Sequence, residues 1–121
     1  MMMQNLEVCR DLGDAIAKVT YDKNVLIIAS TDLTHYEPQE KTTKKDQLII
    51  NTILNLDEES LQKVVELNNS SMCGYGPATV ALIAAKKLGA TKAKLLSYKT
   101  SGDITNNGRS VVGYAALSII R

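Results

Sequence analysis

A run of five apolar residues, Val25–Ala29, constrains the fold of this chain more than any other feature of the sequence. The run is rich in β-branched side chains, does not alternate with polar residues, and lies between Asn24 and Ser30. A strand without alternation is typical of a parallel sheet whose two faces are covered by helices. The run therefore predicts a central, buried strand of an α/β protein.

Helical patterns account for most of the remaining chain. Apolar residues recur at steps of three and four, which predicts helices over residues 5–20, 43–55, 58–67 and 77–88. Asp57 stands where it would cap the third of these helices. The last helix is the clearest, because Pro77 is placed at its first position and Gly89 just past its end.

Two further strands are predicted over residues 93–99 and 110–120, with a Gly/Asn-rich loop over 100–109 between them. Residues 31–39 are polar, contain Pro38, and predict a loop after the first strand. The expected fold is α/β, one domain with a helix-flanked mixed β-sheet. Three strands are few for four helices, which indicates that more sheet belongs upstream or in a partner chain.

Composition excludes several classes of partner. The net charge is +1, which gives no electrostatic reason to expect nucleic acid or an anionic membrane. No apolar stretch approaches the roughly 20 residues that span a bilayer, and the N-terminus has no secretory signal. Cys9 and Cys73 lie far apart, so free thiols and a cytoplasmic location are expected.

The segment after the first predicted strand contains His35, the only histidine, and Asp32 three residues before it. Ligand sites in α/β sheets form beyond the ends of strands. A carboxylate beside an imidazole fixes its tautomer and raises its basicity, as a general base or a metal ligand requires. The alternative is a histidine without a chemical role, with Asp32 capping a turn.

A second candidate segment, Ser71–Pro77, leads into the last predicted helix and contains Cys73. Its two glycines let the backbone approach a ligand, and the helix N-terminus lowers the pKa of a nearby thiol. Cys73 is therefore a candidate metal ligand or nucleophile, or else a small buried cysteine before a turn. Cys9 lies on an apolar helix stripe, which predicts a core position.

Thr100–Asp103 also follows a predicted strand and forms either a third wall of the same crevice or an ordinary turn. One histidine and one cysteine do not complete a metal site, because even open catalytic sites usually take three protein ligands.

Several blocks of the sequence together resemble the MEMO-like family. The blocks are Ser30–Pro38, Met72–Pro77, Leu88–Ala90, Tyr98–Asp103 and Ser110–Ala115. Family members are considerably longer, and residues 1–121 resemble the C-terminal portion of one MEMO-like domain. The resemblance implies the fold of class III extradiol dioxygenases, which are non-haem iron enzymes that open catechol rings.

The resemblance also assigns roles to single residues. Cys73 matches the family's cysteine metal ligand, His35 matches the pocket histidine that serves the dioxygenases as acid/base, and Asp32 matches the aspartate beside it. The family's two metal-ligating histidines lie in its N-terminal half and have no counterpart here. The resemblance thus implies iron or copper in a complete protein and no tight metal binding by this chain alone.

Three hypotheses follow. The first is a metal-dependent redox or dioxygenase-type enzyme whose site is completed by a missing N-terminal half. The second is a non-catalytic module that docks a protein or peptide in the same pocket. The third is a fragment with no independent function, which would expose an unpaired sheet edge and apolar surface meant for its missing half and would therefore tend to dimerise. The first two require His35 and Cys73 to face each other across one cleft.

Overall fold

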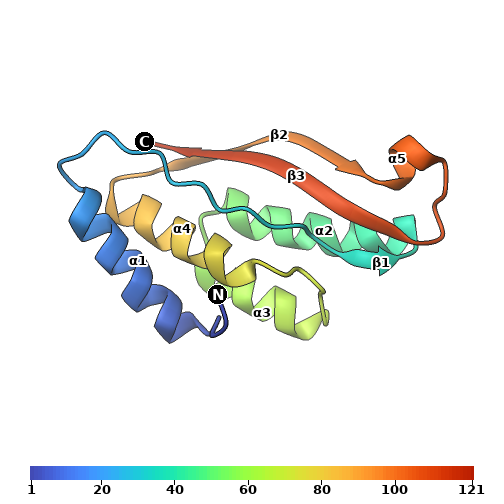
Figure 1. Ribbon diagram of the computed structural model, residues 1–121, viewed down its shortest axis with the longest axis horizontal. Helices are drawn as coiled ribbons and strands as arrows, with labels where there is room; N and C mark the ends of the chain where they lie inside the picture. Colours follow the sequence, from blue (N-terminus) through green and yellow to red (C-terminus); the bar gives the residue numbers. More distant parts are fainter.

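A three-stranded antiparallel sheet lies over a stack of helices, and a computed structural model describes all residues, 1–121 (Figure 1). The helices are α1 (Leu6–Thr20), α2 (Gln39–Leu54), α3 (Glu58–Leu67), α4 (Tyr75–Lys87) and the short α5 (Gly102–Thr105). The strands are β1 (His35–Glu37), β2 (Lys92–Thr100) and β3 (Val111–Ile120), in the order β1-β3-β2. The predicted α/β fold with a helix-flanked sheet is confirmed. None of the helices has both the length and the apolar character that crossing a bilayer would require.

Local signals in the sequence explain where the helices begin and end. The Asp57 side chain accepts a hydrogen bond from the Ser60 N–H at 3.0 Å and caps α3, as predicted. Gly89 follows α4 with a φ of +96°, a conformation that glycine adopts without strain. α2 begins at Gln39, earlier than predicted, because Pro38 ends the preceding extended segment and stands at the cap position.

The prediction of a central strand at Val25–Ala29 is wrong. The segment is not part of any strand, and no backbone N–H or C=O of residues 24–32 bonds to another backbone group. Leu26 is 83% exposed and Ile28 77% exposed. The apolar pattern suits a sheet interior, but no strand of this chain pairs with the segment. Pairing begins only where the Leu33 N–H bonds to the Gly113 carbonyl at 3.0 Å.

Two predicted loops contain short elements. β1 forms inside the predicted loop 31–39, and α5 forms inside the predicted loop 100–109. β1 pairs with the start of β3, with His35 opposite Val112. This pairing places His35 in an edge strand of the sheet.

Aliphatic side chains form the core, as the absence of Phe and Trp requires. The main cluster joins α2, α3 and α4 beneath the sheet and consists of Leu33, Ile49, Ile50, Ile53, Leu61, Val65, Met72, Ala78 and Leu82. Cys9 lies in a smaller cluster with Val80 and Ile83, where α1 packs on α4, and its predicted core position is confirmed. Burial raises the pKa of the Cys9 thiol, which keeps it unreactive.

Candidate functional site

Asp32, His35 and Cys73 come together at one point of the molecule. Their side-chain donor atoms, an oxygen, a nitrogen and a sulfur, all lie within 4.8 Å of one another. Asp32 and His35 stand at the entrance to β1, and Cys73 stands in the turn before α4. The sequence argument expected His35 and Cys73 to share a cleft, and the structure places them together. The chemical roles of the three residues stay predictions.

His35 and Asp32 form a pair at the protein surface. The imidazole Nε2 lies 3.4 Å from the Asp32 Oδ2, and the side chains are 22% and 48% exposed. A carboxylate in this position favours a proton on the nitrogen that faces it, so the other ring nitrogen is the basic one. The His35 backbone N–H donates to the Ser71 hydroxyl at 2.7 Å, which joins this segment to the Cys73 turn.

The Thr31 hydroxyl links Cys73 to the same segment. Thr31 Oγ1 lies 3.5 Å from Cys73 Sγ, accepts a hydrogen bond from the Gly74 N–H at 2.8 Å, and donates to the Asp32 carbonyl at 2.8 Å. Because its single proton is used by that carbonyl, the oxygen is free to accept the thiol proton. Cys73 is exposed, so the alternative of a buried structural cysteine is wrong.

The Cys73 turn and the segment that contains Thr31 approach so closely that only glycine fits at position 74. A Cβ at this position would lie 2.5 Å from the Thr31 Cβ and 2.6 Å from its hydroxyl oxygen. Only a residue without a side chain lets the Gly74 N–H reach Thr31 and keeps Cys73 beside it.

Gln4 holds the other side of the Cys73 turn, a role that the sequence did not reveal. Its side-chain oxygen accepts from the Gly76 N–H at 2.8 Å, and its side-chain nitrogen donates to the Cys73 carbonyl at 3.3 Å. The contact spans about seventy residues of sequence, and nothing local in the polar stretch before α1 signals it.

Asp46 on α2 fixes the backbone of the segment that carries His35. This buried carboxylate on α2 accepts from the Thr34 N–H at 2.9 Å and from the Tyr98 hydroxyl at 2.7 Å. Burial, together with the hydrogen bond to Asp46, raises the pKa of Tyr98 well above its usual range, so the phenol stays a donor. Asp46 therefore ties the segment that carries His35 to β2.

A bulge in β2 aims Tyr98 at this carboxylate. The register with β3 shifts between Leu95 and Ser97, and the extra residue, Leu96, points outward at 59% exposure. One inserted residue moves every later side chain to the opposite face of a strand. Asp46 itself carries a sequence signal, because it precedes Ile49, Ile50 and Ile53 at helical spacing and so lies on a buried stripe.

Tyr36 belongs to the same segment, and the sequence argument gave it no role of its own. Its φ is +57°, in the left-handed region, where a non-glycine residue costs about 1 kcal/mol. The strain follows from the irregular pairing between His35 and Glu37. The side chain is 78% exposed, and its ring centroid lies 5.8 Å from that of His35. An aromatic surface thus borders the cluster.

Thr100–Asp103 does not take part in the cluster. The Asp103 carboxylate accepts from the Thr100 N–H at 2.7 Å, and this bond is the main cause that lowers the Asp103 pKa. Its other partner is Gln39, at 3.4 Å. The interpretation as an ordinary turn fits these contacts.

Comparison with known proteins finds a matching family model and relatives that carry the same family description. Residues 1–118 match the family model described as Memo-like protein. A MEMO1 family protein of Methanocaldococcus jannaschii is 52% identical over 118 residues, and one of Methanococcus maripaludis is 50% identical over 121 residues. A third, from Methanopyrus kandleri, is 45% identical over 119 residues.

The chain is much shorter than these relatives. The matches cover 96%, 98% and 97% of this chain but 41%, 43% and 42% of the respective relatives. The chain therefore spans about two fifths of the length of the curated proteins it matches.

Proposed function

This chain belongs to the Memo-like protein family, and from that premise we propose that it forms one side of a metal-dependent redox site of the dioxygenase type. The observation that supports the proposal is the grouping of the Asp32, His35 and Cys73 donor atoms within 4.8 Å. The family resemblance makes Cys73 the metal ligand, His35 the acid/base residue and Asp32 the residue that positions His35.

The donor set suits a transition metal. A thiolate, an imidazole and a carboxylate are side chains that bind such ions. His35 and Asp32 pair with each other, whereas Cys73 is exposed and has no charged partner. Cys73 would hold an iron or copper ion, and a bound ion would supply the redox chemistry that side chains lack. Thr31 keeps the sulfur in place through the bond that it accepts from Gly74.

His35 would act as the acid/base residue. Its Nε2 faces Asp32, which leaves the other ring nitrogen free to take a proton from a substrate hydroxyl and to return it later. Asp32 positions the ring and stabilises the imidazolium that forms. Asp46 and Ser71 hold the backbone on either side of His35, so the imidazole is presented in a fixed place.

His35 and Asp32 take the acid/base and positioning roles, so Cys73 is the one ligand that this chain would contribute. One protein ligand does not hold a metal ion tightly. The other ligands would come from the part of the family's chain that lies outside these residues. We therefore expect this chain alone to retain little iron or copper after purification.

A chimera tests the proposal. This chain would replace its matched region in the Methanocaldococcus jannaschii relative, and bound iron and copper would be measured after purification. We expect close to one ion per chimera, lost in Cys73→Ala and kept in Cys9→Ala, the control that removes the other thiol. Metal content that Cys73→Ala leaves unchanged would contradict the ligand role.

His35→Ala separates the acid/base role from a ligand role. The variant chimera should keep its metal and lose catechol-dependent oxygen uptake. Loss of metal equal to that of Cys73→Ala would instead make His35 a ligand and remove the acid/base assignment.

The second candidate is a non-catalytic module that docks a peptide or protein in the same pocket, and Tyr36 is the observation that favours it. Exposed aromatic side chains are enriched where proteins bind each other, and this one borders the cluster at 78% exposure. A peptide library screened against the chain tests this function. Binding that is lost in Tyr36→Ala and kept in Cys73→Ala favours docking. If the library yields no binding peptide, docking of a peptide is excluded.

A cytoplasmic location is part of the proposal. Cys9 and Cys73 are both free, and a thiol ligand such as Cys73 needs a reducing compartment to stay available. To test this location, thiols outside the cytoplasm are first blocked in intact cells, and Cys73 is then labelled with a thiol reagent that enters the cytoplasm. Labelling of Cys73 under these conditions supports the cytoplasmic location, and no labelling contradicts it.

A further inference from the structure

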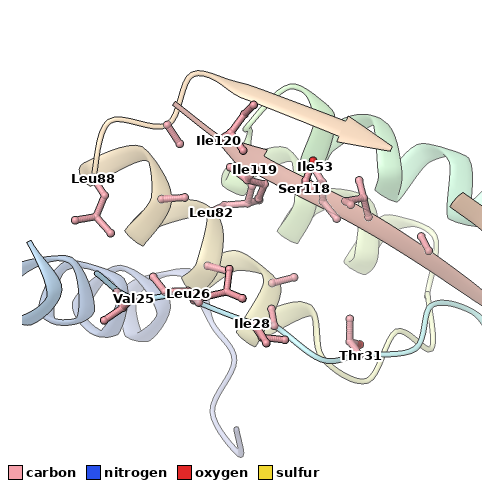
Figure 2. A pocket seen from close by; sticks show the side chains of 18 of the residues that line it. Val25, Leu26, Ile28, Thr31, Ile53, Leu82, Leu88, Ser118, Ile119 and Ile120 are labelled. Atoms are coloured by element: carbon pink, nitrogen blue, oxygen red, sulfur yellow. The ribbon is translucent and has the colours of Figure 1, made fainter. Parts of the chain in front are cut away.

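An apolar groove lies between the extended segment Val25–Ala29 and strand β3. Its volume is about 620 Å³, and 18 of its 21 lining residues are hydrophobic. Figure 2 shows Val25, Leu26 and Ile28 on one side, Ile119 and Ile120 on the other, and Leu82 of α4 between them. A cavity of this volume with a mainly apolar lining is large enough to receive a ligand or a segment of polypeptide.

The β3 side of the groove is an unpaired strand edge. Gly113 accepts from the Leu33 N–H at 3.0 Å and donates to the Thr34 carbonyl at 2.9 Å, so its backbone groups point to this edge. Backbone groups alternate between the two edges of a strand. Those of Ala115, Leu117 and Ile119 therefore point to the same edge, while β2 occupies the opposite one. No strand pairs with this edge beyond Val112.

The other side of the groove is also unpaired. Residues 24–32 form no backbone–backbone hydrogen bond, although Val25–Ala29 is extended and strongly apolar. The Leu33–Gly113 bond joins the two sides, and the groove lies between Val25–Ala29 and the rest of β3 (Figure 2). Buried backbone groups need partners, so whatever fills this opening must supply donors and acceptors to both edges as well as apolar side chains.

We propose that the groove receives a β-strand from the part of the Memo-like chain that lies outside these residues, which joins Val25–Ala29 and β3 into one continuous sheet. A strand meets the requirement because it bonds on both edges and lies about 4.8 Å from each neighbour. The relatives extend beyond their matched regions by nearly three fifths of their length, so they contain chain enough to supply it.

A second copy of this chain fits the groove less well. Its β3 has only one free edge, because β2 occupies the other, so that strand cannot bond to both sides of the groove. Its extended apolar segment Val25–Ala29 is joined to α1 at one end and to the Leu33–Gly113 bond at the other. It cannot enter another groove without leaving this arrangement.

The inserted strand would also approach the metal-binding cluster. Thr31 lines the groove and lies 3.5 Å from Cys73 Sγ, so one end of the strand lies near that sulfur. The strand proposal rests on unpaired edges and apolar surface, and it stands whether or not a metal binds.

Hydrogen exchange of single amides tests the strand. The chain alone would be compared with the chimera that carries the rest of the Methanocaldococcus jannaschii relative. We expect the amides of Val25–Ala29 to include newly protected ones, and those of Ala115, Leu117 and Ile119 to slow by about 100-fold or more, because strand amides open only with the surrounding sheet.

Leu26→Asp and Leu67→Asp form a matched pair of variants, since the two side chains are 83% and 84% exposed in this chain. Both should leave the stability of the chain alone unchanged. Within the chimera, Leu26→Asp should abolish the new protection and Leu67→Asp should keep it.

Unchanged exchange at these amides in the chimera would overturn the proposal. Protection of the same amides in the chain alone that grows with protein concentration would also overturn it, because the occupant would then be a second copy. Cys73→Ala in the chimera separates this proposal from the metal site: the protection should persist in a protein that has lost its metal.

Discussion

Residues 24–30 and residues 31–37 are two halves of one extended stretch, and they differ in what holds them. In the second half, the backbone N–H groups of Leu33, Thr34 and His35 donate to Gly113, Asp46 and Ser71. In the first half, no backbone group bonds to another backbone group. The half that carries the candidate site is fixed by this chain's own groups, and the apolar half is not.

This difference separates the site from the sheet. The cluster of Asp32, His35 and Cys73 forms from contacts within the chain and needs no further strand. The free edge of β3, by contrast, faces the unpaired segment Val25–Ala29 across an apolar groove. A partner strand would therefore extend an already organised site, so the two halves should respond differently to mutation.

The largest expected contrast is between Leu33→Ala and Leu26→Ala. Leu33 is 3% exposed and belongs to the main core cluster, so its truncation should lower the free energy of unfolding by about 3 kcal/mol. Leu26 is 83% exposed, so its truncation should change that free energy by less than about 0.5 kcal/mol. Urea unfolding of the chain alone measures both. Equal losses would mean that the first half is packed in solution and would end the comparison.

Asp46→Ala is expected to have the next largest effect. It leaves the Thr34 N–H and the Tyr98 hydroxyl without their partner in a buried place, which should cost about 2 kcal/mol. Tyr98→Phe removes one of the two bonds and should cost about half as much. The loss should be accompanied by faster exchange of the Thr34 amide. A stable Asp46→Ala variant with an unchanged Thr34 amide would show that other contacts fix the His35 segment.

Sequence patterns predicted the parts of this molecule that depend on neighbours in sequence. Helical periodicity and the Asp57 cap located α3 to the residue, and Gly89 marked the end of α4. The pattern of Val25–Ala29 is typical of a sheet interior, but a strand forms only where a second strand lies beside it, and no local pattern reports that.

In the candidate site, too, the sequence revealed the features that local motifs carry and not those that depend on contacts between distant residues. The sequence singled out Asp32, His35 and Cys73, which share one cluster. It gave no sign that Gln4 would hold the Cys73 turn, because that contact joins residues far apart in the sequence. The bulge that turns Tyr98 toward Asp46 is likewise a property of strand pairing, which is fixed by the whole sheet.

Gly74→Ala tests how tightly the second half is joined to the Cys73 turn. The new Cβ would lie within 2.6 Å of Thr31, so one segment must move, at a cost of about 1–2 kcal/mol. Gly108→Ala is the control, because its Cβ would meet Gln39 at an ordinary 3.7 Å. Thermal unfolding and the rate of thiol labelling at Cys73 should change in the first variant only. Unchanged labelling in Gly74→Ala would mean that Thr31 does not position the sulfur.

The smallest effect concerns Glu37, which ends the second half and is 21% exposed. Lys45, at 2.9 Å, and Lys41, at 3.0 Å, lower its pKa, with the hydrogen bond from Lys45 as the main cause. A carboxylate whose pKa is lowered by folding adds stability above its unfolded pKa of about 4.5, and that stability disappears as the pH falls through the lowered value. Glu37→Gln should therefore cost about 0.5–1 kcal/mol at pH 7 and nothing in strong acid. Glu40→Gln is the control, since this side chain is 87% exposed and should matter at neither pH. If urea unfolding shows the same cost for Glu37→Gln at pH 7 and pH 3, packing rather than charge holds this end of the segment.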